Sequence, residues 1–581
     1  MVWPEHISDH TRADRSRPGW SGVRLKSVSI REIRVRNLVR SVSGNLELGT
    51  WNLEPYPPGA MSQMLKSSGA LASATLTSRI LGMVREIVYA RFMGDGVVAS
   101  AFKLAFQIPN LFRRLLGEGA LSAAFIPIFK AKEKTEGDLE MWRSANAVIS
   151  ALVVVAAAII ALVMLGISLV LALHNFDANT HLMLLLLRVM FPYMLVICLT
   201  AVLMGMLNAR GHFFVPAAGA VILNLVMIAS VLFLAPRMGP NLNQQIFGLA
   251  IGVLIAGMAQ AAFQLPTLTG AGFRFHWVSP WRDPTVREVV RKMVPGALGV
   301  AAFQINVLLT NGIAFWVDPQ IVASFDYAVR LMELPQGVFG ISLATYLLPT
   351  LSGLAVEKNY ADFRSTLQQG LSYLIYVNLI ASVLLVVLAE PIIRLIFERG
   401  QFDGNSTRRA AFALACLAPG LVAFSMVNVL ARAFYALGDT RTPMKISVIC
   451  LGLNLVFALW LILPLRQGGL GIANTLTAAW NVGLLLYALR RKLARLDLTP
   501  LLQALPAKLG SAIVAGAAAW VAGHFWQRSL GHADLPARLG AVFVPMTLAG
   551  LIYWGTTFCL RVPAAQEIAA LVLQKLHASS K

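Results

Sequence analysis

Charged side chains interrupt several runs of apolar sequence, and most of them are cations. Arg79 and Arg85 lie in one run, Lys103 and Arg113 lie in the next, and Arg330 lies in a later one. A charge at the centre of a bilayer costs roughly 2.5–3.5 kcal/mol on insertion scales, so each needs a physical reason to be there. Arginine stays ionised and grips phosphate oxygens through two parallel N–H donors. The surplus of cations predicts a wet cavity that holds an anionic substrate.

The same charges also have structural explanations. Arg85 and Glu86 can pair with neighbouring side chains as structural ions, and Asp326 and Arg330 lie four residues apart on one helix face, where they can neutralise each other. Glu118 stands between two glycines and can cap a broken helix. We prefer substrate contact for the arginines and leave both interpretations open for the carboxylates.

Signatures of nucleotide, metal and hydrolase chemistry are absent from the sequence. No GxxxxGK[ST], HExxH or GxSxG string occurs, so ATP hydrolysis and the corresponding proteases and esterases are unsupported. The four cysteines lie inside apolar runs without the spacing of metal ligands. We therefore expect a transporter rather than an enzyme, with no cofactor and no metal site.

The composition indicates a membrane protein. Hydrophobic residues make up 57% of the 581 residues and charged residues 13%, against roughly 45–50% and 25% in soluble domains. From Met61 onward we find about 14 apolar runs of the roughly 20 residues that span a bilayer, and none alternates as barrel strands do. The predicted fold class is an all-α polytopic membrane protein with about 14 transmembrane helices.

The net charge of +21 comes mainly from Lys and Arg in short loops between the apolar runs. They gather in alternate loops, which include 130–146, 267–292 and 490–508. Loops of this kind face the cytoplasm, and an even number of spans then places both termini there. The pattern argues against a nucleic-acid partner, because the cations do not share one polar face.

Two parts of the chain repeat the same short strings in the same order, about 224–230 residues apart. The pairs are Val98-Ala99-Ser100 with Val322-Ala323-Ser324, and Leu223-Asn224-Leu225-Val226 with Leu453-Asn454-Leu455-Val456. They predict two parallel six-helix repeats, with the substrate between them. The expected organisation is a polar, disordered extension or mis-set start at 1–60, an N-lobe at 61–290, a C-lobe at 291–500, and two further helices with a cytoplasmic tail at 501–581.

Five strings carry a family resemblance: Ser78–Glu86, Ile108–Leu115, Gly117–Pro127, Arg330–Pro335 and Gly438–Pro443. Together they resemble the MurJ (MviN) lipid II flippases of the multidrug/oligosaccharidyl-lipid/polysaccharide exporter superfamily, over residues 61–560. The resemblance implies two six-helix lobes around a cationic cavity, and a groove beside the last two helices for a polyprenyl tail. It also implies the bacterial cytoplasmic (inner) membrane.

The resemblance assigns roles to individual residues. The arginines essential in the family fall on Arg79, Arg85, Arg113 and Arg330. Ser78, Asn110, Glu118 and Glu333 match supporting positions, and we expect Ser78 and Asn110 to contact the substrate. Lys103 and Asp326 are expected to act with Glu118 and Glu333 in gating or support.

Three positions depart from the family pattern. Ser100 stands where the family usually has an acidic residue, Gln107 where it has a basic one, and Val329 where an Asp commonly occurs. Lys103 lies one turn before Gln107 on the same face and can compensate for the missing base, and Asp326 lies one turn from Val329. Gating by the missing carboxylates is therefore not expected to transfer from the family. The departures leave the four arginines intact.

The predicted function is translocation of lipid II, the undecaprenyl-diphosphate-linked peptidoglycan precursor, to the outer leaflet by alternating access. Its partners would be lipid II, the bilayer and the cell-wall synthesis machinery, with the protein itself a monomer. The membrane potential would favour outward movement of the anion, and the identity of a coupling ion stays open. The alternatives are export of another lipid-linked oligosaccharide and an integral-membrane glycan polymerase, for which Glu398 and Asp403 are the available carboxylates in the longest outer loop.

Overall fold

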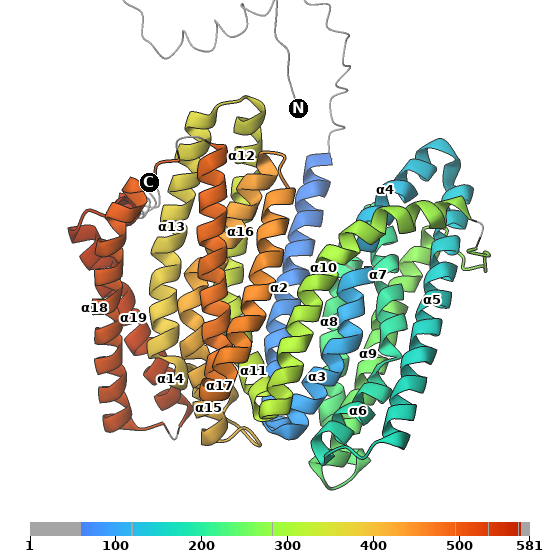
Figure 1. Ribbon diagram of the computed structural model, residues 1–581, viewed down its shortest axis with the longest axis horizontal. Helices are drawn as coiled ribbons and strands as arrows, with labels where there is room; N and C mark the ends of the chain where they lie inside the picture. Colours follow the sequence, from blue (N-terminus) through green and yellow to red (C-terminus); the bar gives the residue numbers. More distant parts are fainter. Residues whose placement is uncertain are drawn as a thin grey trace, which may run out of the picture. The chain divides into compact units, whose positions relative to one another are not determined.

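The structure is a computed structural model, and it describes residues 60–117, 120–281, 283–493, 496–532, 534–567 and 569–570. Every regular element in these ranges is a helix (Figure 1). The predicted all-α class is therefore confirmed. Apart from Ala60, the predicted N-terminal extension lies outside the described residues.

The first part of the chain forms helices α2 to α9. Their bounds are α2 (Ala60–Met93), α3 (Val97–Phe112), α4 (Ala120–Thr135), α5 (Gly137–Leu173), α6 (Ala178–Met190), α7 (Tyr193–Ala209), α8 (Phe214–Ala229) and α9 (Leu242–Gly270). Pro109 lies near the end of α3, which gives way to a π-helical turn at Arg113–Gly117. A proline cannot donate the helical hydrogen bond, and such irregular turns often mark functional positions.

The second part forms helices α10 to α19. Their bounds are α10 (Pro284–Val317), α11 (Gln320–Pro335), α12 (Ser342–Val356), α13 (Tyr360–Val387), α14 (Ala389–Phe397), α15 (Gly404–Leu417), α16 (Leu421–Ala436), α17 (Arg441–Lys492), α18 (Thr499–Leu530) and α19 (Leu535–Cys559). Like α3, α11 ends at a proline, Pro335, and is followed by a π-helical turn, here at Gln336–Ile341.

Nine helices in the described ranges are long and apolar enough to cross a membrane, and the bent pair α6–α7 makes ten. Helix α17 appears once in that number although it contains a break, because Arg466 adopts a non-helical conformation with φ at 48° and ψ at −124°. The chain is therefore a multi-pass membrane protein, as its composition predicts.

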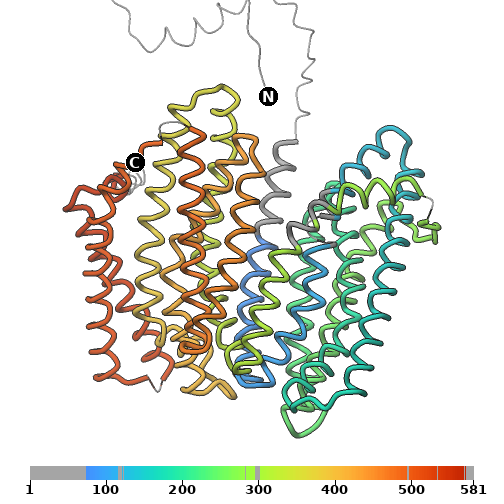
Figure 2. Tube along the Cα trace, in the orientation of Figure 1, coloured from blue at the N-terminus to red at the C-terminus, as the bar shows by residue number. Residues whose placement is uncertain are grey.

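Three groups of buried apolar residues hold the described helices together. The largest extends through α2 to α11 and on to α17, and a second joins α12, α13, α16 and α17. A third packs α18 and α19 against α13, and Figure 2 shows these two last helices beside it. Helix α19 also contributes Val542 to the largest group, and the prediction that α18 and α19 are an addition to the repeats stays a prediction.

The helical turns at Ser230–Leu234 and Ala235–Met238, which continue α8, pack closely on α9 because α9 presents two glycines at GxxxG spacing. A Cβ atom on Gly252 would lie 2.3 Å from Ser230 Oγ, and one on Gly248 would lie 2.7 Å from the Cα atom of Ala235. Small residues let two backbones approach within a membrane, where apolar surface alone does not drive association. The spacing is thus used for helix packing.

We expect Gly248→Ala to destabilise the protein by about 1–3 kcal/mol, because the added methyl group meets backbone that cannot move aside easily. Thermal unfolding in detergent micelles measures the effect. Gly166→Ala is the matched control, since a Cβ atom there has no neighbour within 4 Å. An equal midpoint for both variants would contradict the packing role of Gly248.

Candidate substrate-binding site

A network of ion pairs connects α2 with α3. Arg85 Nη2 donates to Glu86 Oε1 at 2.7 Å, and Lys103 Nζ lies 3.9 Å from Glu86 Oε2. Glu86 is only 5% exposed, so its charge is stable there only because cations surround it. Arg85 and Glu86 are therefore paired with each other, and Lys103 joins the pair.

The network continues onto α11. Lys103 Nζ donates to Asp326 Oδ2 at 2.7 Å and lies 3.4 Å from the centroid of the Tyr327 ring. Arg330 lies 3.8 Å from Asp326 and 3.1 Å from Glu333. The expected Asp326–Arg330 pair exists, but the closer partner of Asp326 is Lys103. Segments more than 220 residues apart in sequence thus share one charged cluster.

Arg79 lines a cavity of about 640 Å³ between α2 and the start of α12. The other lining residues are Gly337, Val338, Ile341, Ser342, Thr345 and Tyr346. The approach of Arg79 depends on a glycine, because a Cβ atom on Gly337 would lie 3.1 Å from Arg79 Nη1. An exposed guanidinium at the wall of a mostly apolar cavity that also presents the hydroxyls of Ser342 and Thr345 is suited to bind an anion.

Asn224 on α8 holds α2 in position. Arg85 Nη1 donates to Asn224 Oδ1 at 3.0 Å, and Asn224 Nδ2 donates to the backbone carbonyl of Ser78 at 3.3 Å. The Ser78 carbonyl therefore takes part in helix packing. Sequence reasoning used Asn224 only as a repeat marker, although a polar residue inside an apolar run was itself a signal.

Arg113 and Asn110 meet on the same helical face, where Arg113 Nε donates to Asn110 Oδ1 at 2.7 Å. Arg113 lies in the π-helical turn after α3. The neighbouring Arg114 donates to Gln304 on α10 at 3.2 Å. Glu118 lies outside the described residues, so its predicted role stays a prediction.

The three departures from the family pattern form or flank neutral contacts. Ser100 Oγ accepts a hydrogen bond from the Ala323 backbone N–H at 3.0 Å, and Gln107 Oε1 accepts from Asn311 Nδ2 at 2.8 Å. Val329 is partly buried against the apolar core. Ser100 and Gln107 therefore join α3 to the second part of the chain without charge, while Lys103 and Asp326 supply the charged contact.

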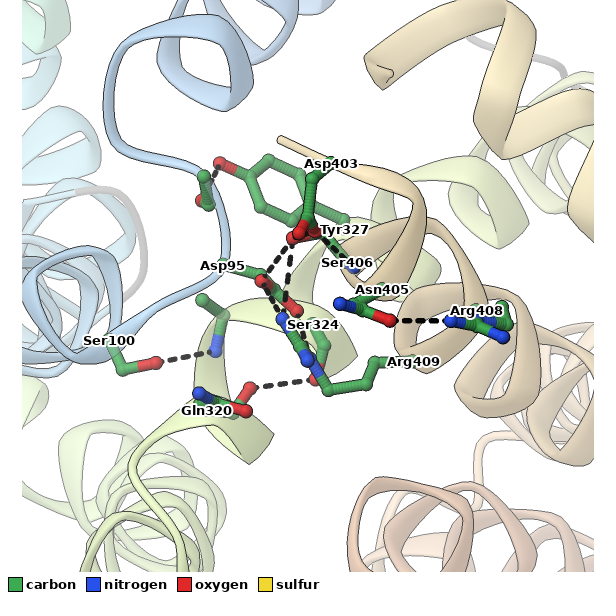
Figure 3. Close-up of polar contacts among 12 residues, drawn as sticks. Asp95, Ser100, Gln320, Ser324, Tyr327, Asp403, Asn405, Ser406, Arg408 and Arg409 are labelled. Carbon is green, nitrogen blue, oxygen red and sulfur yellow. Dashed lines mark hydrogen bonds and ion pairs between the residues drawn. The ribbon is translucent and has the colours of Figure 1, made fainter. Parts of the chain in front are cut away.

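A further contact, which sequence reasoning missed, joins the turn after α2 to the start of α15. Arg409 donates to both carboxylate oxygens of Asp95, at 2.7 and 2.6 Å, and Ser406 Oγ donates to Asp95 at 2.6 Å (Figure 3). Asp95 is 1% exposed. The backbone N–H of Ser406 also donates to Asp403, which lowers the pKa of the Asp403 carboxyl. In sequence, Gly94-Asp95-Gly96 looks like an ordinary turn.

Backbone contacts strengthen the same junction, which we call the Asp95 junction. Tyr327 Oη donates to the Gly94 carbonyl at 3.1 Å, and the Gln401 N–H donates to the Arg91 carbonyl at 3.0 Å. Gly94 has φ at +62°, and a Cβ atom there would lie 2.6 Å from the Gln401 carbonyl oxygen. The two parts of the bundle are thus closed against each other at this end.

A charged cluster inside an apolar helical bundle, beside a cavity and closed at one end, defines a polytopic membrane transporter. Two solved structures share the fold. "Lipid II flippase MurJ, inward closed conformation" matches with a TM-score of 0.68 at 20% identity, covering 84% of this chain and 99% of that one. A multidrug resistance MATE family transporter of the MOP superfamily, inward-facing, matches at 0.53 and 16% identity, covering 73% and 94%.

The sequence comparisons are more specific. The profile of the family described as lipid II flippase MurJ matches residues 89–540. A probable lipid II flippase MurJ of Haemophilus influenzae is 35% identical over 447 residues, covering 73% of this chain and 85% of that protein. One of Rhizobium meliloti is 33% identical over 533 residues, covering 89% and 98%. This chain belongs to the MurJ family of lipid II flippases.

We expect Arg409→Gln to loosen the Asp95 junction, because it leaves a buried carboxylate without its cation, at a cost of about 1.5–3 kcal/mol to the closed arrangement. Spin labels on α3 and α15 would report longer and broader distances. Arg408→Gln is the matched control, because Arg408 is exposed and bonds to Asn405 within its own helix. Equal distance distributions in the two variants would rule out a closing role for Arg409.

Proposed function

We propose that this protein moves lipid II from the cytoplasmic to the outer leaflet of the bacterial inner membrane by alternating access. The observation that carries the proposal is the charged cluster that joins Arg85, Lys103 and Arg330 across α2, α3 and α11 in a member of this family. A diphosphate is the part of lipid II that such a cluster would bind, since guanidinium groups match phosphate geometry.

The proposed fold has about 14 membrane-spanning helices. It counts α17 as two spans divided at Arg466, takes the bent α6–α7 pair as one, and adds α2, α3 with its π-helical turn, and α10. The charges on α2 and α3 make these helices less apolar than the others, although Arg85, Glu86 and Lys103 among them are paired. A span whose charges face a polar site can still cross the bilayer.

Two parallel repeats are supported by matching irregularities and contacts. α3 and α11 each end near a proline and continue as a π-helical turn. Arg85 on α2 bonds Asn224 on α8, and at the corresponding place Asn306 on α10 donates to Asn454 on α17 at 3.1 Å. We place the lobes at 61–290 and 291–500, with the substrate between them.

In the proposed orientation both termini are cytoplasmic, as the distribution of Lys and Arg predicts. The Asp95 junction follows the C-terminal end of α2 and would then close the outer side. The Arg79 cavity would be reached from the cytoplasmic side, which corresponds to an inward-facing state. We place the polyprenyl tail along α18 and α19, outside the main core.

The carboxylates of the cluster allow it to bind a substrate by exchanging ion-pair partners. Without substrate, Glu86 and Asp326 neutralise the cations. A diphosphate entering the cluster would exchange partners with them, with Arg79 and Arg113 as further contacts. A bound diphosphate would leave Glu86 and Asp326 with fewer cations, and Arg79 and Arg113 would supply the positive charge that keeps the cluster balanced. Outward movement of one negative charge gains about 2.3 kcal/mol per 100 mV of membrane potential, so no nucleotide is needed.

The glycan polymerase alternative loses its candidate carboxylates. Glu398 pairs with Arg394 at 3.1 Å and accepts a hydrogen bond from Thr407 at 2.8 Å. Asp403 caps the first turn of α15 by accepting from the Ser406 N–H at 2.8 Å. Both carboxylates are therefore occupied by contacts that stabilise the fold.

Family membership disfavours the other alternative, which is export of a different lipid-linked oligosaccharide. Contact with the cell-wall synthesis machinery and the monomeric state stay predictions.

We expect Arg85→Ala to abolish transport. The test measures lipid II exposed on the outer face of cells depleted of their own flippase that express the full chain. Since removal of Arg85 leaves the buried Glu86 with Lys103 at 3.9 Å, the variant can also lose stability, by about 3–5 kcal/mol.

A second variant separates the two effects. Arg85→Ala with Glu86→Gln removes the uncompensated carboxylate, and it should restore the protein level without restoring lipid II exposure. Arg143→Ala is the control, because Arg143 is exposed and pairs with Glu140 on its own helix. Wild-type exposure from the double variant would overturn the role of Arg85. No exposure from the well-expressed wild type would overturn lipid II as the substrate.

A further inference from the structure

The segment between α9 and α10 is extended and is fixed to the side of a membrane-spanning helix. Asn146 Nδ2 on α5 donates to the Arg274 carbonyl at 3.0 Å, and the His276 N–H donates to Asn146 Oδ1 at 3.4 Å. One turn further along α5, Ser150 Oγ accepts from the Val278 N–H at 3.3 Å. Asn146 and Ser150 are fully buried, and their side chains form hydrogen bonds with the backbone of the segment.

Contacts with α5 fix both ends of this segment, residues 273–281, one of them apolar and the other polar. At its start, Phe273 is buried against Trp142 of α5, with ring centroids 5.5 Å apart. Just after it, Thr285 in the first turn of α10 lies 3.4 Å from Ser144 of α5, hydroxyl to hydroxyl. The segment therefore has a defined position against α5.

The segment turns large aromatic side chains outward. Trp281 is 76% exposed, and Phe275 and Trp277 are each 57% exposed. A structure that needed only to connect two helices would not place three aromatic rings outside its core, where contact with water is unfavourable. Tryptophan is enriched at membrane interfaces because its ring is apolar and its N–H finds polar partners there.

The positions of Asn146 and Ser150 along α5 indicate how deep the segment lies in the bilayer. Exposed apolar residues continue along α5 to its end at Leu173. About 20 residues cross the hydrocarbon core, which counts back from Leu173 to about residue 153. Ser150 then lies about one turn beyond the core, and Asn146 about two turns. This level corresponds to the headgroup layer, where backbone that is not helical can still be hydrated.

We propose that residues 273–281 form an interfacial anchor, with Phe275, Trp277 and Trp281 inserted among phospholipid headgroups beside α5. The leaflet is the cytoplasmic one in the orientation proposed above, but the depth does not depend on that choice. The anchor fixes the level of α5 in the bilayer, so that the first part of the bundle keeps its depth while the second part moves against it.

Depth-dependent fluorescence quenching tests the anchor. The full chain is reconstituted in vesicles of equal parts phosphatidylglycerol and phosphatidylcholine, with bromine at shallow or deep acyl positions. The difference between wild type and Trp277→Phe with Trp281→Phe isolates these two indoles. We expect shallow bromine to quench that contribution at least about two-fold more than deep bromine, as for other interfacial tryptophans.

Two controls make the outcome decisive. Trp520→Phe isolates an exposed indole inside the span α18, and deep bromine should quench it more strongly. Asn146→Ala removes the bond to the Arg274 carbonyl, and the pair should lose its preference for the shallow label. Quenching of the pair by aqueous iodide and by neither brominated lipid would overturn the anchor, as would preferential quenching by the deep label.

Discussion

The neutralisation of charge inside an apolar bundle is the constraint on which the rest of this structure depends. Ions taken out of water are stable only with partners of opposite charge and well-placed hydrogen bonds. Glu86, Lys103 and Asp326 meet this condition together, because Lys103 lies between the two carboxylates. These residues come from α2, α3 and α11, so their charges are compensated only when the three helices pack together.

Two junctions of different character join the first and second parts of the chain. In the charged cluster, Arg330 is partly exposed and has carboxylate partners on its own helix, which an anion can replace. In the Asp95 junction the carboxylate is almost completely buried and held by two donors of one guanidinium. The first suits an exchange of partners with a substrate. The Asp95 junction suits a closure whose contacts form or break together, as alternating access requires.

Contacts at the departures show how this chain joins its helices where the family pattern usually has a charge. Gln107 meets Asn311 through a neutral hydrogen bond, and Lys103 bonds Asp326 one turn away. An ionic link between α3 and α11 is thus present although Gln107 carries no charge. Such a shift is possible because residues three or four apart lie on one helical face. Residue roles in the family therefore need not transfer position by position.

The sequence by itself determined the class of the protein. Run lengths and composition indicated a helical membrane protein, and the strings around Arg79, Arg85 and Arg113 indicated the family. The local pair Asp326–Arg330 could be inferred because residues four apart lie on one face of a helix.

Only the tertiary structure decided which distant residues meet. Nothing in the local sequence connects Asp95 with Arg409, Lys103 with Asp326, or Asn146 with the backbone of segment 273–281. These contacts depend on how whole helices cross, which packing of the entire bundle sets. Periodicity and composition report on neighbours along one helix, whereas a charge or an amide is satisfied by whatever the fold brings to it from elsewhere in the chain.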